Sequence, residues 1–253
     1  MCLAPNNTVT PMKLQIYSDL HLGFARFEPA PRGADVVILA GDIDIKSRGV
    51  KWANEIFQCA VIYVCGNHEF YGGHIDHTLR KMKDAAEPHV HVLENEVLIL
   101  GQTRFLVTTA WTDYSSTGDV TAAKRVAWEW MNDFNAIRTD ENYRRLRPDD
   151  LIAKSKAAYA WLTQELDKPF DGETVVVTHH APVLDYVGDE LPTHLVAAYA
   201  NDWKELVSRP DLWVYGHTHV SADFLKNGCR VISNPRGYPN QQTGFNPDFL
   251  IEI

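Results

Sequence analysis

Short runs of apolar, often β-branched residues recur along the chain and constrain its fold more than any other feature. Several of them, such as VVILA at 36–40 and TVVV at 174–177, are continuously apolar and do not alternate with polar residues. Strands of this kind are buried on both faces, as in parallel or mixed sheets covered by further layers. We expect strands over 13–18, 36–41, 60–66, 97–101, 104–110, 174–179, 212–217, 230–234 and 249–253.

Helical patterns lie between these runs. We expect helices at about 48–58, 74–86, 121–136, 149–167 and 194–207. Strand and helix alternate in the first half of the chain, whereas the C-terminal third is mostly strand. This order predicts an α/β (α+β) fold in which two mixed β-sheets pack as a sandwich flanked by helices.

The 253 residues show no internal repeat and no Gly/Ser-rich linker. We therefore expect a single domain over 12–253, preceded by a disordered extension at 1–11. The segment at about 114–150 is rich in aromatic and basic residues and is expected to be a helical insertion. The favoured interpretation is that its aromatic side chains pack on the core. The alternative is that its arginines recognise part of a substrate: Arg125, Arg138, Arg144, Arg145 and Arg147.

The composition limits the location and the partners of the protein. A net charge of −9 disfavours extensive binding to nucleic acid or to an anionic membrane. The chain has no secretory signal and no run of 18 apolar residues, and its four cysteines form no Cys-x-x-Cys pair. These features predict a cytoplasmic protein with reduced thiols and no membrane association; they leave the oligomeric state open.

Side chains that can bind a metal follow five of the expected strands. In an extended segment residues two apart point the same way, so pairs with this spacing are expected to reach one ion. Glycines before several of these residues allow a sharp turn at the strand end. The residues are Asp19, His21, Asp42, Asn67, His68, His179, His180, His217 and His219.

Carboxylate, amide and imidazole ligands without a thiolate suit Mn, Fe or Zn. The set is large enough for two ions, and Asp42, which stands alone, could bridge them. His180 could replace His179 as a ligand. This alternative is less favoured, because neighbouring residues of a strand face opposite ways.

The motifs DLH, GD, GNHE, THH and GHTH resemble the signature of the calcineurin-like metallophosphoesterase superfamily, from Asp19 to beyond His219. The resemblance implies a β-sandwich flanked by helices, two divalent transition-metal ions with Mn favoured, and a small phosphorylated substrate. One ion would be held by Asp19, His21 and His219, and the other by Asn67, His179 and His217, with Asp42 between them. His68 would contact the phosphate and protonate the leaving group.

The implied reaction is direct, in-line attack of a metal-bridging hydroxide on a phosphomonoester or a phosphodiester, with His68 as general acid. Some family members carry a tyrosine where this chain has Ile45, or Arg where it has His68, and protein phosphatases read GDxVDRG instead of GDIDIKSRG. These departures favour a small bacterial-type phosphatase or phosphodiesterase. A nuclease acting on nucleic-acid ends and a non-catalytic binding scaffold are the alternatives. The acidic charge disfavours the first, and the complete ligand set disfavours the second.

Other polar residues are weaker candidates. Asn67 and Arg236 are expected to bind substrate, the latter by a bidentate contact to phosphate, although a purely structural turn at SNPRGYP is equally compatible with the sequence. Glu69 is expected to orient its neighbours. Tyr71, Trp111 and Asp113 are possible residues of the pocket rim, and His74, His77, His89 and His91 are expected at the surface.

Overall fold

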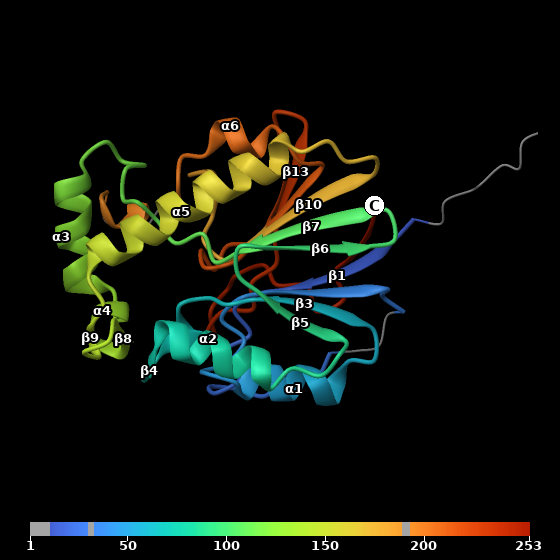
Figure 1. Cartoon of the computed structure of the whole chain (residues 1–253), viewed down its shortest axis with the longest axis horizontal. Helices are drawn as coiled ribbons and strands as arrows, with labels where there is room; N and C mark the ends of the chain where they lie inside the picture. The colour runs from blue at the N-terminus through green and yellow to red at the C-terminus, as the bar shows by residue number, and fades with distance from the viewer. Residues whose placement is uncertain (1–10, 30–32, 189–192) are drawn as a thin grey trace, which may run out of the picture.

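Two β-sheets stacked face to face form the centre of the molecule (Figure 1). The computed structural model describes residues 11–29, 33–188 and 193–253, so the extension expected at 1–11 lies almost wholly outside the described residues. The first sheet has the order β14-β1-β2-β3-β5, with β14 antiparallel to β1 and the other pairs parallel. Its strands are β1 (Lys13–Tyr17), β2 (Val36–Ala40), β3 (Ala60–Val64), β5 (Val90–Leu93) and β14 (Leu250–Glu252).

The second sheet has the order β12-β13-β11-β10-β7-β6. Its central strands are parallel, and its two edge strands, β12 and β6, are antiparallel to their neighbours. Its strands are β6 (Glu96–Leu100), β7 (Thr103–Thr108), β10 (Glu173–Thr178), β11 (Leu212–Tyr215), β12 (Ala222–Lys226) and β13 (Cys229–Ser233). The predicted pair of mixed sheets is confirmed.

The continuously apolar strands are buried because each face of each sheet is covered. On β2, Ile38 and Ala40 pack into the layer between the sheets, whereas Val37 and Leu39 pack on the opposite side. Successive side chains of a strand point to opposite faces, so one run of apolar residues supplies two layers of core.

Helices form the outer layers (Figure 1). Below the first sheet lie α1 (Arg48–Ile56) and α2 (Ile75–Asp84), and above the second lie α5 (Pro148–Asp167) and α6 (Lys204–Val207). Proline at the first position of α5 suits a helix start, because its missing N–H has no intrahelical partner there. No helix among the described residues is long and apolar enough to cross a membrane.

Two of the expected helices are broken. The helix expected at 121–136 is α3 (Val120–Trp130) followed by α4 (Asp133–Ala136), because Met131 is extended. The helix expected at 194–207 is a 3-10 turn, η2 (Leu195–Ala198), followed by α6. Between these two elements the backbone N–H of Asn201 donates to Ala181 at 2.9 Å, and this bond to a distant loop interrupts the helix.

The segment at 114–150 is only partly helical. Besides α3 and α4 it contains β8 (Ile137–Thr139) and β9 (Arg144–Arg145), which form a small sheet with β4 (Gly73–His74).

In the two large sheets, the strand ranges predicted above omitted β5 and β12. Both are edge strands whose polar residues interrupt the apolar pattern, so the rule used for buried strands missed them.

We expect Ile38→Ala to lower the free energy of unfolding by about 2–5 kcal/mol, because Ile38 is fully buried between the two sheets. Ile99→Ala on the edge strand β6 is the matched control, since Ile99 is 55% exposed. Urea unfolding followed by circular dichroism measures both changes. Equal losses in the two variants would contradict the assignment of the layer between the sheets as the main core.

Candidate metal centre

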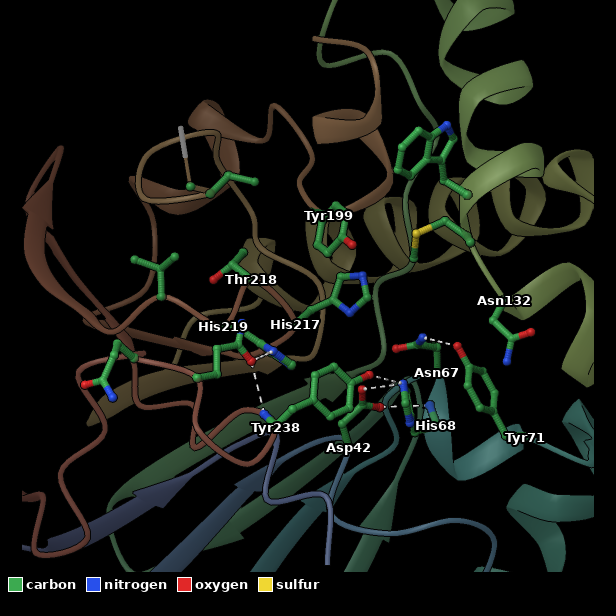
Figure 2. A pocket seen from close by; sticks show the side chains of 17 residues that line it. Asp42, Asn67, His68, Tyr71, Asn132, Tyr199, His217, Thr218, His219 and Tyr238 are labelled. Atoms are coloured by element: carbon green, nitrogen blue, oxygen red, sulfur yellow. Dashed lines mark hydrogen bonds and ion pairs between the residues drawn. The ribbon is translucent and has the colours of Figure 1, made fainter. Parts of the chain in front are cut away.

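The seven predicted ligands meet at one edge of the sandwich, beyond the carboxyl ends of parallel strands from both sheets. Ligands commonly bind at this end of open α/β sheets. Figure 2 shows that Asp42, His217 and His219 lie around one cavity, together with His68. Asp19 and His21 follow β1, Asp42 follows β2, Asn67 follows β3, His179 follows β10, and His217 and His219 follow β11.

The ligand atoms form two groups that Asp42 connects. The donor atoms of Asp19, His21 and His219 lie within 4.8 Å of one another, and those of Asp42, His179 and His217 do the same. Asp42 also groups with His21 on the side of the first set. A carboxylate in this position reaches both sets, which is what a bridging ligand requires.

The chemistry of the second group fits a bound cation. His179 Nδ1 lies 2.9 Å from the carbonyl oxygen of Ala40 and donates to it, so His179 Nε2 carries a lone pair. This lone pair faces two acceptors, Asn67 Oδ1 at 3.2 Å and Asp42 Oδ1 at 3.5 Å. The amide nitrogen of Asn67 donates to Asp133 at 2.8 Å, which fixes its oxygen toward His179. A metal ion is the partner that converging acceptors need.

The first group has the same character. His219 Nδ1 lies 2.8 Å from Gln241 Oε1, an oxygen that also accepts from the backbone N–H of Tyr238. His219 Nε2 is therefore the free nitrogen, and it lies 3.1 Å from His21 Nε2 and 3.3 Å from Asp19 Oδ1. Both groups hold imidazole nitrogens and oxygen donors without a thiolate, so the residues fit Mn, Fe or Zn.

The backbone is left-handed at five of the seven predicted ligands, contrary to the extended geometry expected from the spacing of Asp19 and His21. β1 ends at Tyr17, and φ is +51° at Asp19 and +47° at His21. Asp42, His217 and His219 also have positive φ. Such residues are strained at a cost of about 1–3 kcal/mol each, and they cluster at functional sites where the surroundings fix them. Sharp turns, not a shared strand face, bring these side chains together.

Glu69 ties the loops after β2 and β3 into one unit. Its buried carboxylate accepts from the backbone N–H groups of Asp42, Ile43 and Gly66 at 2.7–3.0 Å, and from the Tyr63 hydroxyl at 2.8 Å. Gly66 is required because a Cβ there would lie 2.1 Å from Asp42 Oδ1. The predicted orienting role of Glu69 agrees with these contacts.

Burial determines the protonation of three of the predicted histidine ligands. It lowers the pKa of His21 to about 3, although Asp19 opposes the shift, and it lowers the pKa of His179 and His217. These imidazoles are neutral at pH 7 and can offer lone pairs. Burial, reinforced by Glu69 and Asp19, raises the pKa of Asp42. Its carboxylate is thus costly to ionise without a nearby cation.

Comparison with known proteins identifies the family. A family model described as calcineurin-like phosphoesterase matches residues 12–221. The chain belongs to the calcineurin-like phosphoesterase family. The protein L509 of Acanthamoeba polyphaga mimivirus is 26% identical over 213 residues, which cover 76% of this chain and 73% of that protein. The crystal structure of phosphopantetheinyl hydrolase from Mycobacterium tuberculosis has the same fold, with a TM-score of 0.65 and 17% identity over 96% of both chains.

One histidine of this calcineurin-like phosphoesterase lies beside the predicted metal ligands but belongs to neither of the two predicted sets. His68 follows Asn67, and its backbone N–H donates to Asp42 Oδ1 at 2.8 Å. Its ring stacks on Tyr71, with centroids 4.2 Å apart, and its Nε2 lies 3.2 Å from the hydroxyl of Tyr238. Tyr71, a weak candidate from the sequence, lines the cavity.

Arg236 does not line this cavity. Its guanidinium donates to the carbonyl oxygens of Leu20, Ala25 and Arg26 at 2.8–3.1 Å. These three bonds use Nη1 and Nη2 of the guanidinium, so Arg236 holds a loop in place. They favour the structural alternative over the predicted bidentate contact to phosphate.

Three residues of the site were missed in the sequence. Tyr238 stands two residues after Arg236 in the same motif, stacks on His21 at 4.5 Å and contacts His68. Asp133 orients Asn67 from the inserted segment, and Gln241 orients His219. Only Tyr238 had a signal, since it belongs to the motif SNPRGYP that also contains Arg236.

The remaining candidates lie outside the cavity. His180 is buried beside His217, and its Nδ1 contacts the carbonyl oxygen of Thr109 at 3.2 Å; it belongs to none of the ligand groups found among the described residues. Trp111 is buried against His180, and Asp113 accepts from Ser115. Four histidines were expected at the surface. His74 and His77 stack on each other near Tyr143 and do not line the cavity. His74 is buried, contrary to expectation, whereas His77, His89 and His91 are partly exposed.

The inserted segment reaches the cavity through residues other than its arginines. Arg144 pairs with Asp140 and Asp150, and Arg138 donates to backbone carbonyls. None of the five arginines considered above lines the cavity, whereas Trp130, Met131 and Asn132 do. The favoured packing interpretation agrees with Met131 and Phe134, which are buried, while Trp128 is 46% exposed.

We expect Asp42→Ala to bind at most one ion per chain, because the side chain that connects the two groups is removed. Metal analysis of Mn-loaded protein after gel filtration measures the content, with the wild type as reference. Two tightly bound ions in the variant would contradict a bridging role. Wild-type protein that is active with no more than one ion at saturation would contradict the dinuclear site itself.

We expect Glu69→Gln to weaken metal binding by about 10- to 100-fold, the usual effect of removing an outer partner of a ligand. The amide can accept on one side only, so the loops after β2 and β3 lose contacts with this side chain. Glu87→Gln, at an exposed position, is the control. Metal titration by calorimetry gives the affinities, and an unchanged affinity in Glu69→Gln would show that the loops are held by other contacts.

Proposed function

We propose that the protein hydrolyses a phosphomonoester or a phosphodiester with two divalent transition-metal ions, and that Mn is the favoured metal. The observation that carries this proposal is the arrangement of two groups of metal-binding side chains, which Asp42 connects, with His68 beside them. Membership of the calcineurin-like phosphoesterase family supports it.

The ions would be held by Asp19, His21 and His219 on one side and by Asn67, His179 and His217 on the other, with Asp42 between. Bound there, two divalent ions supply Lewis-acid charge to phosphoryl oxygens and lower the pKa of water. Burial keeps the imidazoles of His21, His179 and His217 neutral. Ala40 fixes the tautomer of His179, and Gln241 orients His219.

His68 is proposed as the general acid that protonates the leaving oxygen. Its Nε2 lies 3.8 Å from Asp42 Oδ2, next to the position where the phosphoryl group would lie, and its side chain is 13% exposed. Burial and the nearby His179 lower the pKa of His68 to about 4 in the absence of substrate. A bound phosphate anion favours the imidazolium and raises this pKa, which is the direction that a general acid requires.

Tyr71 and Tyr238 hold this imidazole from two sides. Tyr71 stacks on the ring and donates its hydroxyl proton to Asp133 at 2.7 Å, which fixes the phenol. The Tyr238 hydroxyl lies at hydrogen-bond distance from His68 Nε2. An imidazole restrained in this way is positioned before the substrate arrives, and such preorganisation lowers the barrier for proton transfer.

We also propose a reducing, cytoplasmic location. The support is that Cys59, Cys65 and Cys229 all have free thiols in the described part of the chain.

A substrate panel with Mn-reconstituted protein tests the proposed activity. It compares p-nitrophenyl phosphate, bis-p-nitrophenyl phosphate and cyclic nucleotides. Metal-dependent hydrolysis of at least one of these esters is expected, and the ratio of the first two rates separates monoesterase from diesterase activity. Fully metal-loaded protein that hydrolyses none of them would count against the proposal.

We expect His68→Ala to keep its metal ions and to lose a factor of about 10² to 10⁴ in kcat on an alkyl phosphate, the usual scale of general acid catalysis. The loss should be much smaller on p-nitrophenyl phosphate, because nitrophenolate leaves without protonation. His77→Ala on α2, away from the cavity, is the control. Equal losses on both esters would assign His68 to phosphate binding instead of proton transfer.

A further inference from the structure

A cavity of about 640 Å³ adjoins the metal ligands and is larger than one phosphoryl group needs (Figure 2). Its floor is formed by ligands and His68. Its walls come from three separate segments, at 130–132, 187–188 and 238–242, together with side chains near the ligands. Because the phosphoryl group occupies the metal end, these walls are placed to contact the organic part of the ester.

The walls combine aromatic and apolar groups with neutral hydrogen-bonding groups. The aromatic and apolar side chains are Tyr71, Trp130, Met131, Val187, Tyr199, Val220 and Tyr238. The neutral polar side chains are Asn132, Thr218, Gln241 and Gln242. Flat apolar surface with a few amides suits an uncharged group that is partly apolar.

Among the described residues, the cavity has no lysine or arginine side chain for a second anionic group. None of its lining residues in the described part of the chain is Lys or Arg, and Asp42 is its one carboxylate. A smaller cavity on the other side of His68 contains Arg48, but this guanidinium is bonded to both carboxylate oxygens of Asp44 at 2.6 and 3.1 Å. A second phosphate or a carboxylate would therefore be desolvated without a countercharge, which is costly.

Trp130 and Asn132 stand at the wall supplied by the inserted segment. Trp130 ends α3 and is 66% exposed, so the core does not depend on it. Its neighbour Trp128 lies on the same helix, packs on Phe134 with ring centroids 5.3 Å apart, and does not line the cavity. The chain thus offers one tryptophan at the cavity and a matched one beside it.

We propose that the substrate carries a single phosphoryl group on an uncharged, partly apolar organic group, and that Trp130 and Asn132 determine this specificity. Trp130 packs on the organic group. Asn132 provides a neutral contact where a polyphosphate-binding enzyme would need a cation. This inference rests on the proposed function and specifies its substrate class. It also disfavours the nuclease alternative, because a nucleic acid brings further phosphates to the site.

Binding of non-hydrolysable phosphonates to Mn-loaded protein, measured by calorimetry, tests the proposal. The probes are ethylphosphonate, benzylphosphonate and 4-carboxybenzylphosphonate. Benzylphosphonate should bind about tenfold more tightly than ethylphosphonate because of the aromatic wall. The carboxylated probe, which differs from benzylphosphonate by one carboxylate group, should bind at least about tenfold more weakly.

Three variants assign the effect to residues. Trp130→Ala should weaken benzylphosphonate about five- to tenfold and leave ethylphosphonate unchanged, whereas Trp128→Ala should change neither. Asn132→Lys should tighten 4-carboxybenzylphosphonate about tenfold. All variants should retain the wild-type metal content and hydrolyse p-nitrophenyl phosphate, which shows that the centre is intact.

The two levels of the proposal fail in different ways. Hydrolysis of p-nitrophenyl phosphate together with equal binding of benzylphosphonate and 4-carboxybenzylphosphonate would overturn the substrate class and leave the phosphoesterase function standing. Equal effects of Trp130→Ala and Trp128→Ala would overturn the assigned wall. Metal-loaded protein that neither hydrolyses an ester nor binds any phosphonate would overturn the proposed function, and this inference with it.

Discussion

At the end of the sandwich, imidazole nitrogens and side-chain oxygens with lone pairs lie close together, and the site depends on this arrangement. His179 Nε2 faces oxygens of Asn67 and Asp42, and His219 Nε2 faces His21 Nε2 at 3.1 Å. Without a cation between them such groups repel one another. The fold must therefore hold them together by other contacts, and a bound ion then relieves the repulsion.

Those other contacts are short and mostly buried. Glu69 binds three backbone N–H groups of the loops that carry Asp42 and Asn67, and Asp133 fixes the amide of Asn67. The left-handed backbone at five ligands adds strain that only a rigid support can maintain. The three apolar layers on both faces of the two sheets supply this support, because tightly packed interiors deform little.

The parts of the site that the sequence predicted are those encoded locally. Asp19, Asp42 and His217 each come directly after an apolar run. Because the ends of parallel strands share one edge of a sheet, the amino-acid pattern alone was enough to predict that these residues meet. Asp133 could not be found in this way, since it acts on Asn67 across 66 residues through a loop whose path the pattern does not reveal. The contacts of Arg236 with three carbonyl groups could not be predicted either, because the sequence shows only its charge. The broken helix at 194–207 has the same cause, since a bond to Ala181 outweighs the local pattern.

The predicted metal ligands and the proposed recognition walls lie on different parts of this chain. The predicted metal ligands follow strand ends, and the phosphopantetheinyl hydrolase from Mycobacterium tuberculosis shares this sandwich at only 17% identity. The cavity walls at 130–132, 187–188 and 238–242 come from segments outside the strands, where substitutions disturb the core least. Trp130, mostly exposed, can change without affecting Asp42, which is fixed by Glu69. A fold arranged in this way can keep one reaction while its substrate changes, so the substrate must be inferred from the walls and not from the ligands.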